Sequence, residues 1–96
     1  MRVENMTSAR GNKVANQFII NDNGAEYFQS YRSIIAKKSQ GKIYLDAYYW
    51  DYSTTTGKYR NQFLNEGIAD TRKKIQSGDC LLYTSDAADD TPCVDL

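Results

Sequence analysis

Residues 42–64 of the chain read KIYLDAYYWDYSTTTGKYRNQFL, and this stretch decides the fold. It holds the only tryptophan, five of the eight tyrosines and one of the three phenylalanines, so no other window supplies as much large apolar surface. Over residues 42–49 the side chains alternate, with Ile43, Leu45 and Ala47 on one face. This alternation predicts a strand with one face in the core.

A short helix is expected directly after this strand. Residues 51–56, DYSTTT, form a polar turn whose Ser and Thr side chains can accept hydrogen bonds from the first free N–H groups of a helix. Tyr59 and Phe63 then lie four residues apart, which places them on the same helix face. The pattern predicts a helix over residues 55–64.

A second helix is predicted over residues 65–77. Ile68, Arg72 and Ile75 would share one stripe of it, and Gly78 is a suitable stop because glycine readily adopts the left-handed conformation at a helix end. The basic residues that precede this stop suit the negative end of the helix dipole. A further strand is expected after Gly78.

An Asn-Gly pair before the central stretch predicts a tight β-hairpin. Asn23 and Gly24 lie between two strand-like runs, residues 17–21 and 26–31, and a type I′ turn needs positive φ at both central residues. The expected partners are Asp22 with Ala25, Ile20 with Tyr27 and Ile19 with Phe28. A third strand is expected over residues 33–38.

The predicted fold class is therefore α+β. We expect a small antiparallel β-meander of about four strands, with room for a fifth after Gly78, packed with one or two short C-terminal helices. The expected organisation is a flexible N-terminal arm over residues 1–15, a single domain over residues 16–84 and a disordered tail over residues 85–96. Met1 and Met6 both remain open as the natural start.

The last residues differ sharply in composition from the rest. All twelve Lys and Arg side chains precede position 80 but only eight of the twelve acids do, so residues 1–79 carry a net charge of +4. Residues 80–90, CLLYTSDAADD, resemble one translated reading frame of a transposon-end adapter used in sequencing libraries, and the CVDL ending resembles its next constant piece. This resemblance implies that the native residues are replaced after about Asp79 and that the tail, with both cysteines, is an artefact.

No catalytic motif is found in the sequence. Histidine is absent, which removes the commonest general base and metal ligand. Asp46 and Asp51 are interpreted as a turn cap and a rim charge, and Thr56-Gly57-Lys58 lacks the remaining residues of a phosphate-binding loop. We expect a protein that is not an enzyme and has no catalytic, cofactor-binding or metal-binding residues.

Three runs carry a resemblance to a known family: NQFII with YFQSY and SIIA, then YLDxYYWDYSTTTGKYRNQFL, then TRKKIQSG. Over about residues 16–79 they resemble small uncharacterised proteins of tailed bacteriophages, a domain of unknown function. The resemblance implies a phage genome and action in the cytoplasm of an infected bacterium. The family has no established catalytic residues, and no apolar run approaches the roughly 20 residues that a membrane span needs.

Two functions are predicted for the aromatic and basic residues of the central stretch. The first is a non-catalytic module that binds a host or phage protein, since tyrosine is frequent in protein interfaces. The alternative is a protein that binds single-stranded nucleic acid through an aromatic and basic sheet face. A third interpretation places the same rings in the core. Strand alternation and the return of the chain after Ser53 predict that Leu45, Trp50 and Phe63 are largely buried and that Tyr48 and Tyr52 are partly exposed. The candidate binding surface comprises Tyr44, Tyr48, Tyr52, Lys58 and Arg60.

Overall fold

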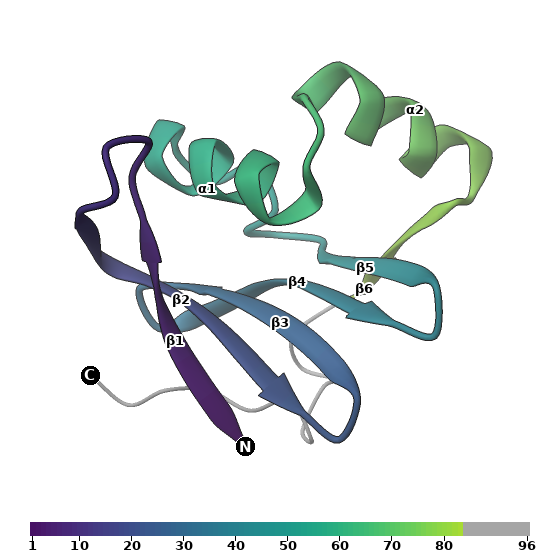
Figure 1. Ribbon diagram of the computed structural model, residues 1–96. Coiled ribbons are helices and arrows are strands. Elements are labelled where there is room, and N and C mark those ends of the chain that lie inside the picture. The colour runs from purple at the N-terminus through teal and green to yellow at the C-terminus, as the bar shows by residue number, and fades with distance from the viewer. Residues whose placement is uncertain (84–96) are drawn as a thin grey trace.

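The computed structural model of the chain describes residues 1–83, which form one twisted sheet with two helices on one of its faces (Figure 1). The strands are β1 (Arg2–Thr7), β2 (Lys13–Asp22), β3 (Ala25–Ser30), β4 (Ser33–Ser39), β5 (Lys42–Asp46) and β6 (Cys80–Tyr83), and the helices are α1 (Thr54–Leu64) and α2 (Ile68–Ser77). Their order in the sheet is β1-β2-β3-β4-β5-β6. The α+β class is confirmed, but the described residues form six strands, more than the four or five expected.

The additional strand comes from the N-terminal residues, which were expected to form a flexible arm. Strand β1 instead pairs antiparallel with β2, which begins at Lys13. Met6 is the one buried side chain of β1, so the strand shows no hydrophobic period that the sequence could reveal. The Asn5 side chain donates to the carbonyl oxygens of Met6 and Val14, at 2.9 and 2.7 Å, and thereby ties β1 to β2.

The hairpin between β2 and β3 is confirmed. Asn23 and Gly24 have φ of 52° and 83°, the positive values that a type I′ turn requires. The register is also as expected, with Asp22 opposite Ala25, Ile20 opposite Tyr27 and Ile19 opposite Phe28. A local turn preference is therefore enough to set the pairing of these strands.

The core lies between the sheet and the helices. Phe28 and Phe63 stack there with their ring centres 5.9 Å apart, and Leu45 is fully buried beside them. A smaller cluster on the other face of the sheet contains Ile20, Ala25 and Tyr27, with Ile34 packed against it. Both faces of the β2–β3 hairpin thus carry apolar side chains, as the sequence predicts.

Strand β5 ends at Asp46, three residues earlier than expected. The Asp46 Oδ1 atom accepts hydrogen bonds from the backbone N–H groups of Tyr48 and Tyr49, both at 2.9 Å. Because a side chain takes these donors, the backbone turns instead of continuing the strand. Ala47, expected to face the core, is exposed.

Helix α1 begins and ends with the expected kinds of caps. The Ser53 hydroxyl accepts a hydrogen bond from the N–H of Thr56 at 3.1 Å, and Asn65 closes the helix in the left-handed conformation with φ of 57°. Tyr59 and Phe63 are both buried, as their spacing predicts.

Helix α2 begins at Ile68 and stops, as expected, at Gly78, whose φ is 90°. Its buried residue is Thr71, and Arg72, expected on one stripe with Ile68 and Ile75, has 60% of its side chain exposed.

Strand β6 occupies the position expected after Gly78 and runs parallel to β5, with Ile43 opposite Cys80. The two helices together form the crossover between these parallel strands, which places both on the same face of the sheet. Cys80 is buried and has a free thiol. The disordered tail expected over residues 85–96 lies outside the described residues.

Candidate functional site

The five residues of the predicted binding surface do not form one surface. Tyr44 is half-buried on β5, on the sheet face opposite the helices, whereas Tyr48 and Tyr52 follow the end of the strand and are 74% and 69% exposed. Lys58 is exposed on α1, but Arg60 is only 1% exposed. An aromatic and basic face along β5 is therefore not formed, because the strand ends before Tyr48.

Arg60 is a structural residue. Its Nη1 donates to the Trp50 carbonyl oxygen at 2.6 Å and to Asp51 Oδ1 at 3.2 Å, and its Nη2 donates to Asn61 Oδ1 at 2.9 Å. Its guanidinium carbon lies 5.2 Å from the centre of the Trp50 ring. Arg60 thus fixes the connection between β5 and α1, and Trp50, expected to be largely buried, is half-buried above it.

Exposed tyrosines gather instead around a surface groove of about 440 Å³, which we call the tyrosine groove. It is lined by Ser30, Tyr31, Arg32, Ser33, Ile35, Tyr49, Tyr52 and Thr56. The β3–β4 turn forms one wall, and the segment between β5 and α1 forms the other. Tyr52 is thus the one member of the predicted surface that lines this groove.

The wall on the α1 side is a cluster of tyrosine rings. Tyr49 and Tyr52 meet edge to face with their centres 5.4 Å apart, and Tyr48 lies 6.5 Å from Tyr49 on the outer side. The bonds from Asp46 to the N–H groups of Tyr48 and Tyr49 hold the backbone of this cluster in place. The side chain of Asp46, which is only 1% exposed, therefore positions these rings.

The opposite wall is built on a strained backbone position. Tyr31 has φ of 58°, a value that few residues other than glycine adopt, and its ring is 50% exposed. The Gln29 amide donates to the Tyr31 carbonyl oxygen at 2.7 Å, and the Tyr31 N–H donates to the Asn16 carbonyl oxygen, also at 2.7 Å. These bonds hold the turn that presents Tyr31 and Arg32 to the groove.

The floor of the groove is the contact between α1 and the sheet. The hydroxyl oxygens of Ser30 and Thr56 lie 3.1 Å apart, and the Ser53 hydroxyl donates to Thr56 Oγ1 at 3.1 Å. Ser30, Thr56 and Ile35 are all buried. The groove therefore has a packed floor and walls held by hydrogen bonds, so its shape is set before any partner binds.

The clearest perturbed carboxylate lies away from the groove. Burial alone would raise the pKa of Glu66, but hydrogen bonds from Lys74 and Thr71 outweigh burial and lower it. Burial raises the pKa of the Cys80 thiol and, more strongly, raises that of Tyr83 to about 12. Within residues 1–83, no three His, Cys, Asp or Glu side chains gather where they could hold a metal ion.

Sequence reasoning missed two of the groove tyrosines. Tyr31 was assigned to the end of a strand, and Tyr49 was assigned to a strand that stops three residues before it. The available signal for the wall formed by the β3–β4 turn was the Tyr31-Arg32 pair at the junction of two strand-like runs. No signal in the sequence brings the turn after Ser30 next to the segment after Asp46.

The fold and the groove define a small α+β protein with a preformed, tyrosine-lined surface groove. The chain belongs to a family of unknown function (DUF8033), whose model matches residues 1–79. This match includes β1 and ends just before β6. No curated protein and no solved structure matches the chain. Neither helix in the described part of the chain is long and apolar enough to cross a membrane.

Proposed function

We propose that the protein is a non-catalytic protein-binding module that engages its partner through the tyrosine groove. The observation that carries this proposal is the exposure of three tyrosine rings around one groove. Tyr31, Tyr49 and Tyr52 leave between 36% and 69% of their surface in solvent. All three line the groove, although a protein of this size could bury large rings in its core.

Tyrosine is well suited to such a surface. Its ring supplies a large contact area, its hydroxyl can donate or accept a hydrogen bond, and few rotatable bonds are immobilised on binding. Edge-to-face packing of Tyr49 on Tyr52 restricts these rings further before a partner arrives. Affinity is favoured when side chains are already ordered in the free protein.

The lining residues indicate the chemistry of the partner. Arg32 is the one charged side chain among them, and the remainder are hydroxyl-bearing or apolar. We therefore propose that the partner presents an extended peptide segment that carries apolar side chains. Such a segment could place its side chains between Tyr31 and Tyr52 and pair its backbone with the hydroxyl groups.

We also propose a biological setting, a tailed bacteriophage whose partner is a host or phage protein in the cytoplasm of the infected bacterium. The support is the sequence resemblance over residues 16–79. The genomic neighbourhood of family members tests this setting directly. Genes for phage structural or replication proteins on both sides would support it, and a consistent setting among bacterial housekeeping genes would contradict it.

A peptide selection tests the groove. The full chain is immobilised and used to enrich peptides from a random displayed library, in parallel with the variants Tyr52→Ser and Tyr48→Ser. Both residues are highly exposed, but Tyr52 lines the groove and Tyr48 does not. We expect the wild type and Tyr48→Ser to enrich the same peptides, which carry apolar side chains, and Tyr52→Ser to lose them.

A binding measurement with an oligothymidylate completes the experiment. Failure to enrich any peptide, or equal enrichment by all three proteins, would overturn the proposal. Tight binding of the oligothymidylate that weakens steeply with salt and depends on Tyr52 would overturn it in favour of the nucleic-acid alternative, because phosphate contacts release counterions.

A further inference from the structure

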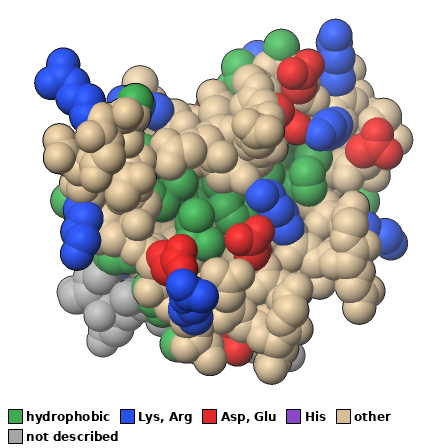
Figure 2. Space-filling view, in the orientation of Figure 1, with side chains coloured by type: hydrophobic (Ala, Val, Ile, Leu, Met, Phe, Trp, Pro, Cys, Tyr) green, Lys and Arg blue, Asp and Glu red, His purple; other side chains and the backbone are tan. Residues whose placement is uncertain are grey.

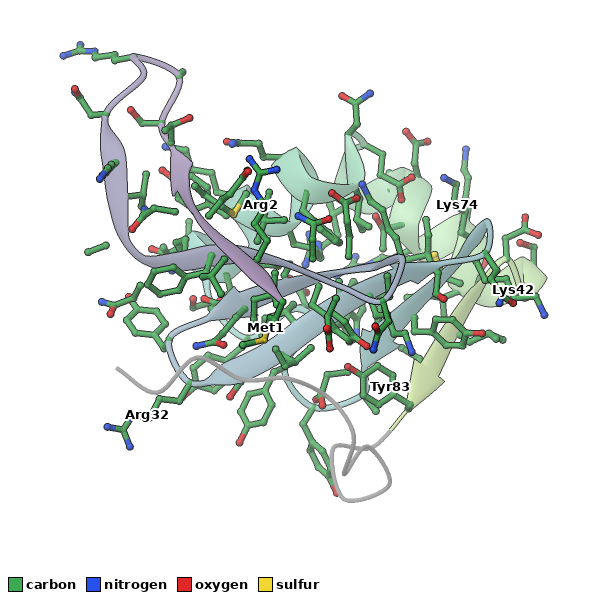
Figure 3. All side chains as sticks on the ribbon, turned by 60° about the horizontal axis from the view of Figure 1, so that its bottom comes forward. Met1, Arg2, Arg32, Lys42, Lys74 and Tyr83 are labelled. Carbon is green, nitrogen blue, oxygen red and sulfur yellow. The ribbon has the colours of Figure 1, made fainter. Side chains whose placement is uncertain are left out.

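Strand β1 is an edge strand whose outer side has no neighbouring strand among residues 1–83. Figure 1 shows it at the border of the sheet, and Figure 3 shows the labelled Met1 and Arg2 at its start. Such an edge presents unpaired N–H and C=O groups that can pair with another chain. Val3, at the middle of the straight part of β1, is 41% exposed.

The charges on this edge strand would not repel a second copy of the chain. Edges are commonly protected by charges that repel an incoming copy. Here Arg2 and Glu4 have opposite signs and lie on either side of Val3, and they form an ion pair of 2.6 Å with 75% and 48% of their side chains exposed. In Figure 2, exposed basic and acidic side chains stand side by side on the surface of the molecule.

Two-fold symmetry allows only a few registers between two copies of β1. A two-fold axis perpendicular to the sheet leaves each side chain of β1 on the same sheet face in both copies. Directly opposite residues must share a face, so the axis must lie midway between one residue and its own copy. An axis at Arg2 or at Glu4 would bring like charges directly opposite each other, which is destabilising. An axis at Val3 places each Arg2 opposite a Glu4 of the second copy. The charges therefore select Val3.

The apolar side chains select the same register. Val3 lies opposite Ile20, and Ile20 lies opposite Tyr27, so the three residues form one row across the sheet. Ile20 and Tyr27 are buried, but the row ends at the exposed Val3. A second Val3 on the two-fold axis would continue this row into the second copy. It would remove apolar surface of both side chains from water.

We propose that the chain forms a symmetric dimer in which β1 pairs antiparallel with β1 of a second copy, with Val3 on the two-fold axis. A bulge between Asn5 and Thr7 ends the straight part of the strand, so the pairing does not extend past Asn5. The interface is short, so the dimer forms in a concentration-dependent way. The family match begins at residue 1, so the paired segment belongs to the region that defines the family.

Charge reversal provides the test. Sedimentation equilibrium of the full chain is compared for wild type, Arg2→Glu, Glu4→Arg, an equimolar mixture of these two variants, and the double variant that exchanges the two charges. We expect wild type to dimerise and each single variant to bind itself about tenfold more weakly or worse, because two like-charge pairs replace two opposite ones. The mixture and the double variant should recover the wild-type affinity.

A matched control is Arg10→Glu, which makes the same charge change at an exposed residue in the turn between β1 and β2. It should dimerise as wild type does, and thermal melting should show that all variants are folded. Monomeric wild type into the millimolar range would overturn the proposal. Single variants that dimerise as well as wild type, or a mixture that does not associate, would also overturn it.

Discussion

The guanidinium group of Arg60 lies against the Trp50 ring, 5.2 Å from its centre, while it donates a 2.6 Å hydrogen bond to the carbonyl oxygen of the same residue. One buried side chain therefore holds both the ring and the backbone of the segment that leads into α1. Asp51, the next residue, is also within reach of Arg60, at 3.2 Å, and of Arg72, at 3.5 Å. Both arginines contact the same carboxylate, but Arg60 is buried and Arg72 is exposed.

This arrangement predicts unequal effects of removing the two arginines. Arg60→Met should lower the free energy of unfolding by about 2–4 kcal/mol, because it removes a buried packing group and leaves the Trp50 carbonyl oxygen without its donor. Arg72→Met should lower it by less than about 1 kcal/mol, since an exposed ion pair contributes little. Urea denaturation of both variants measures the difference. Equal effects would show that Asp51 pairing, rather than the contacts with Trp50, is what Arg60 contributes.

Gly57 lies in the first turns of α1, where glycine weakens a helix. A Cβ atom at this position would lie 3.6 Å from Arg60 Nη2, an ordinary van der Waals contact. Gly57→Ala should therefore stabilise the protein by about 0.5–1 kcal/mol through helix propensity. The matched substitution Gly24→Ala should destabilise it, since Gly24 has φ of 83° in the hairpin turn. The two shifts in thermal midpoint should have opposite signs, and a loss of stability in Gly57→Ala would contradict the prediction.

The parts of the fold that the sequence predicts are those fixed by local chemistry. Asn23-Gly24 determines a turn and hence a register, and Ser53 and Gly78 mark helix ends through their own backbone and side-chain preferences. Strand β1 could not be predicted in this way. Its stabilisation comes from one buried side chain, Met6, and from pairing with strand β2, whose partner residues run from Lys13 to Asn21.

The candidate site was predictable only in part, for a related reason. The exposure of Tyr48 and Tyr52, predicted from strand alternation and from the return of the chain after Ser53, is confirmed. Arg60 was placed on the candidate binding surface as a basic residue close to the aromatic rings, and the sequence does not show that Trp50 and Asp51 fold over it. The partners that bury a charged residue are set by tertiary packing, which a pattern along one helix does not contain.

The Glu66 carboxylate predicts a pH dependence of stability. Its pKa in the folded protein lies below the ordinary value of 4.5. Its stabilising contribution is therefore complete above about pH 4.5 and is lost as the pH falls through the lowered pKa. Between about pH 7 and about pH 3, the thermal midpoint of Glu66→Gln should fall less than that of wild type. Equal pH slopes for wild type and Glu66→Gln would contradict this role.

Asp46 offers a final test of how the groove is held. Its Oδ1 accepts two backbone hydrogen bonds, whereas its buried Oδ2 has no hydrogen-bond partner among the described residues. Asp46→Asn keeps one acceptor oxygen and should retain most of the stability. Asp46→Ala removes the acceptor and should lower the free energy of unfolding by about 1–3 kcal/mol, since two N–H groups lose their partner. Amide hydrogen exchange at Tyr48 and Tyr49 provides the local measurement. These two amides should exchange faster in Asp46→Ala than in wild type and stay protected in Asp46→Asn. Unchanged protection in the alanine variant would show that other contacts hold the tyrosine cluster.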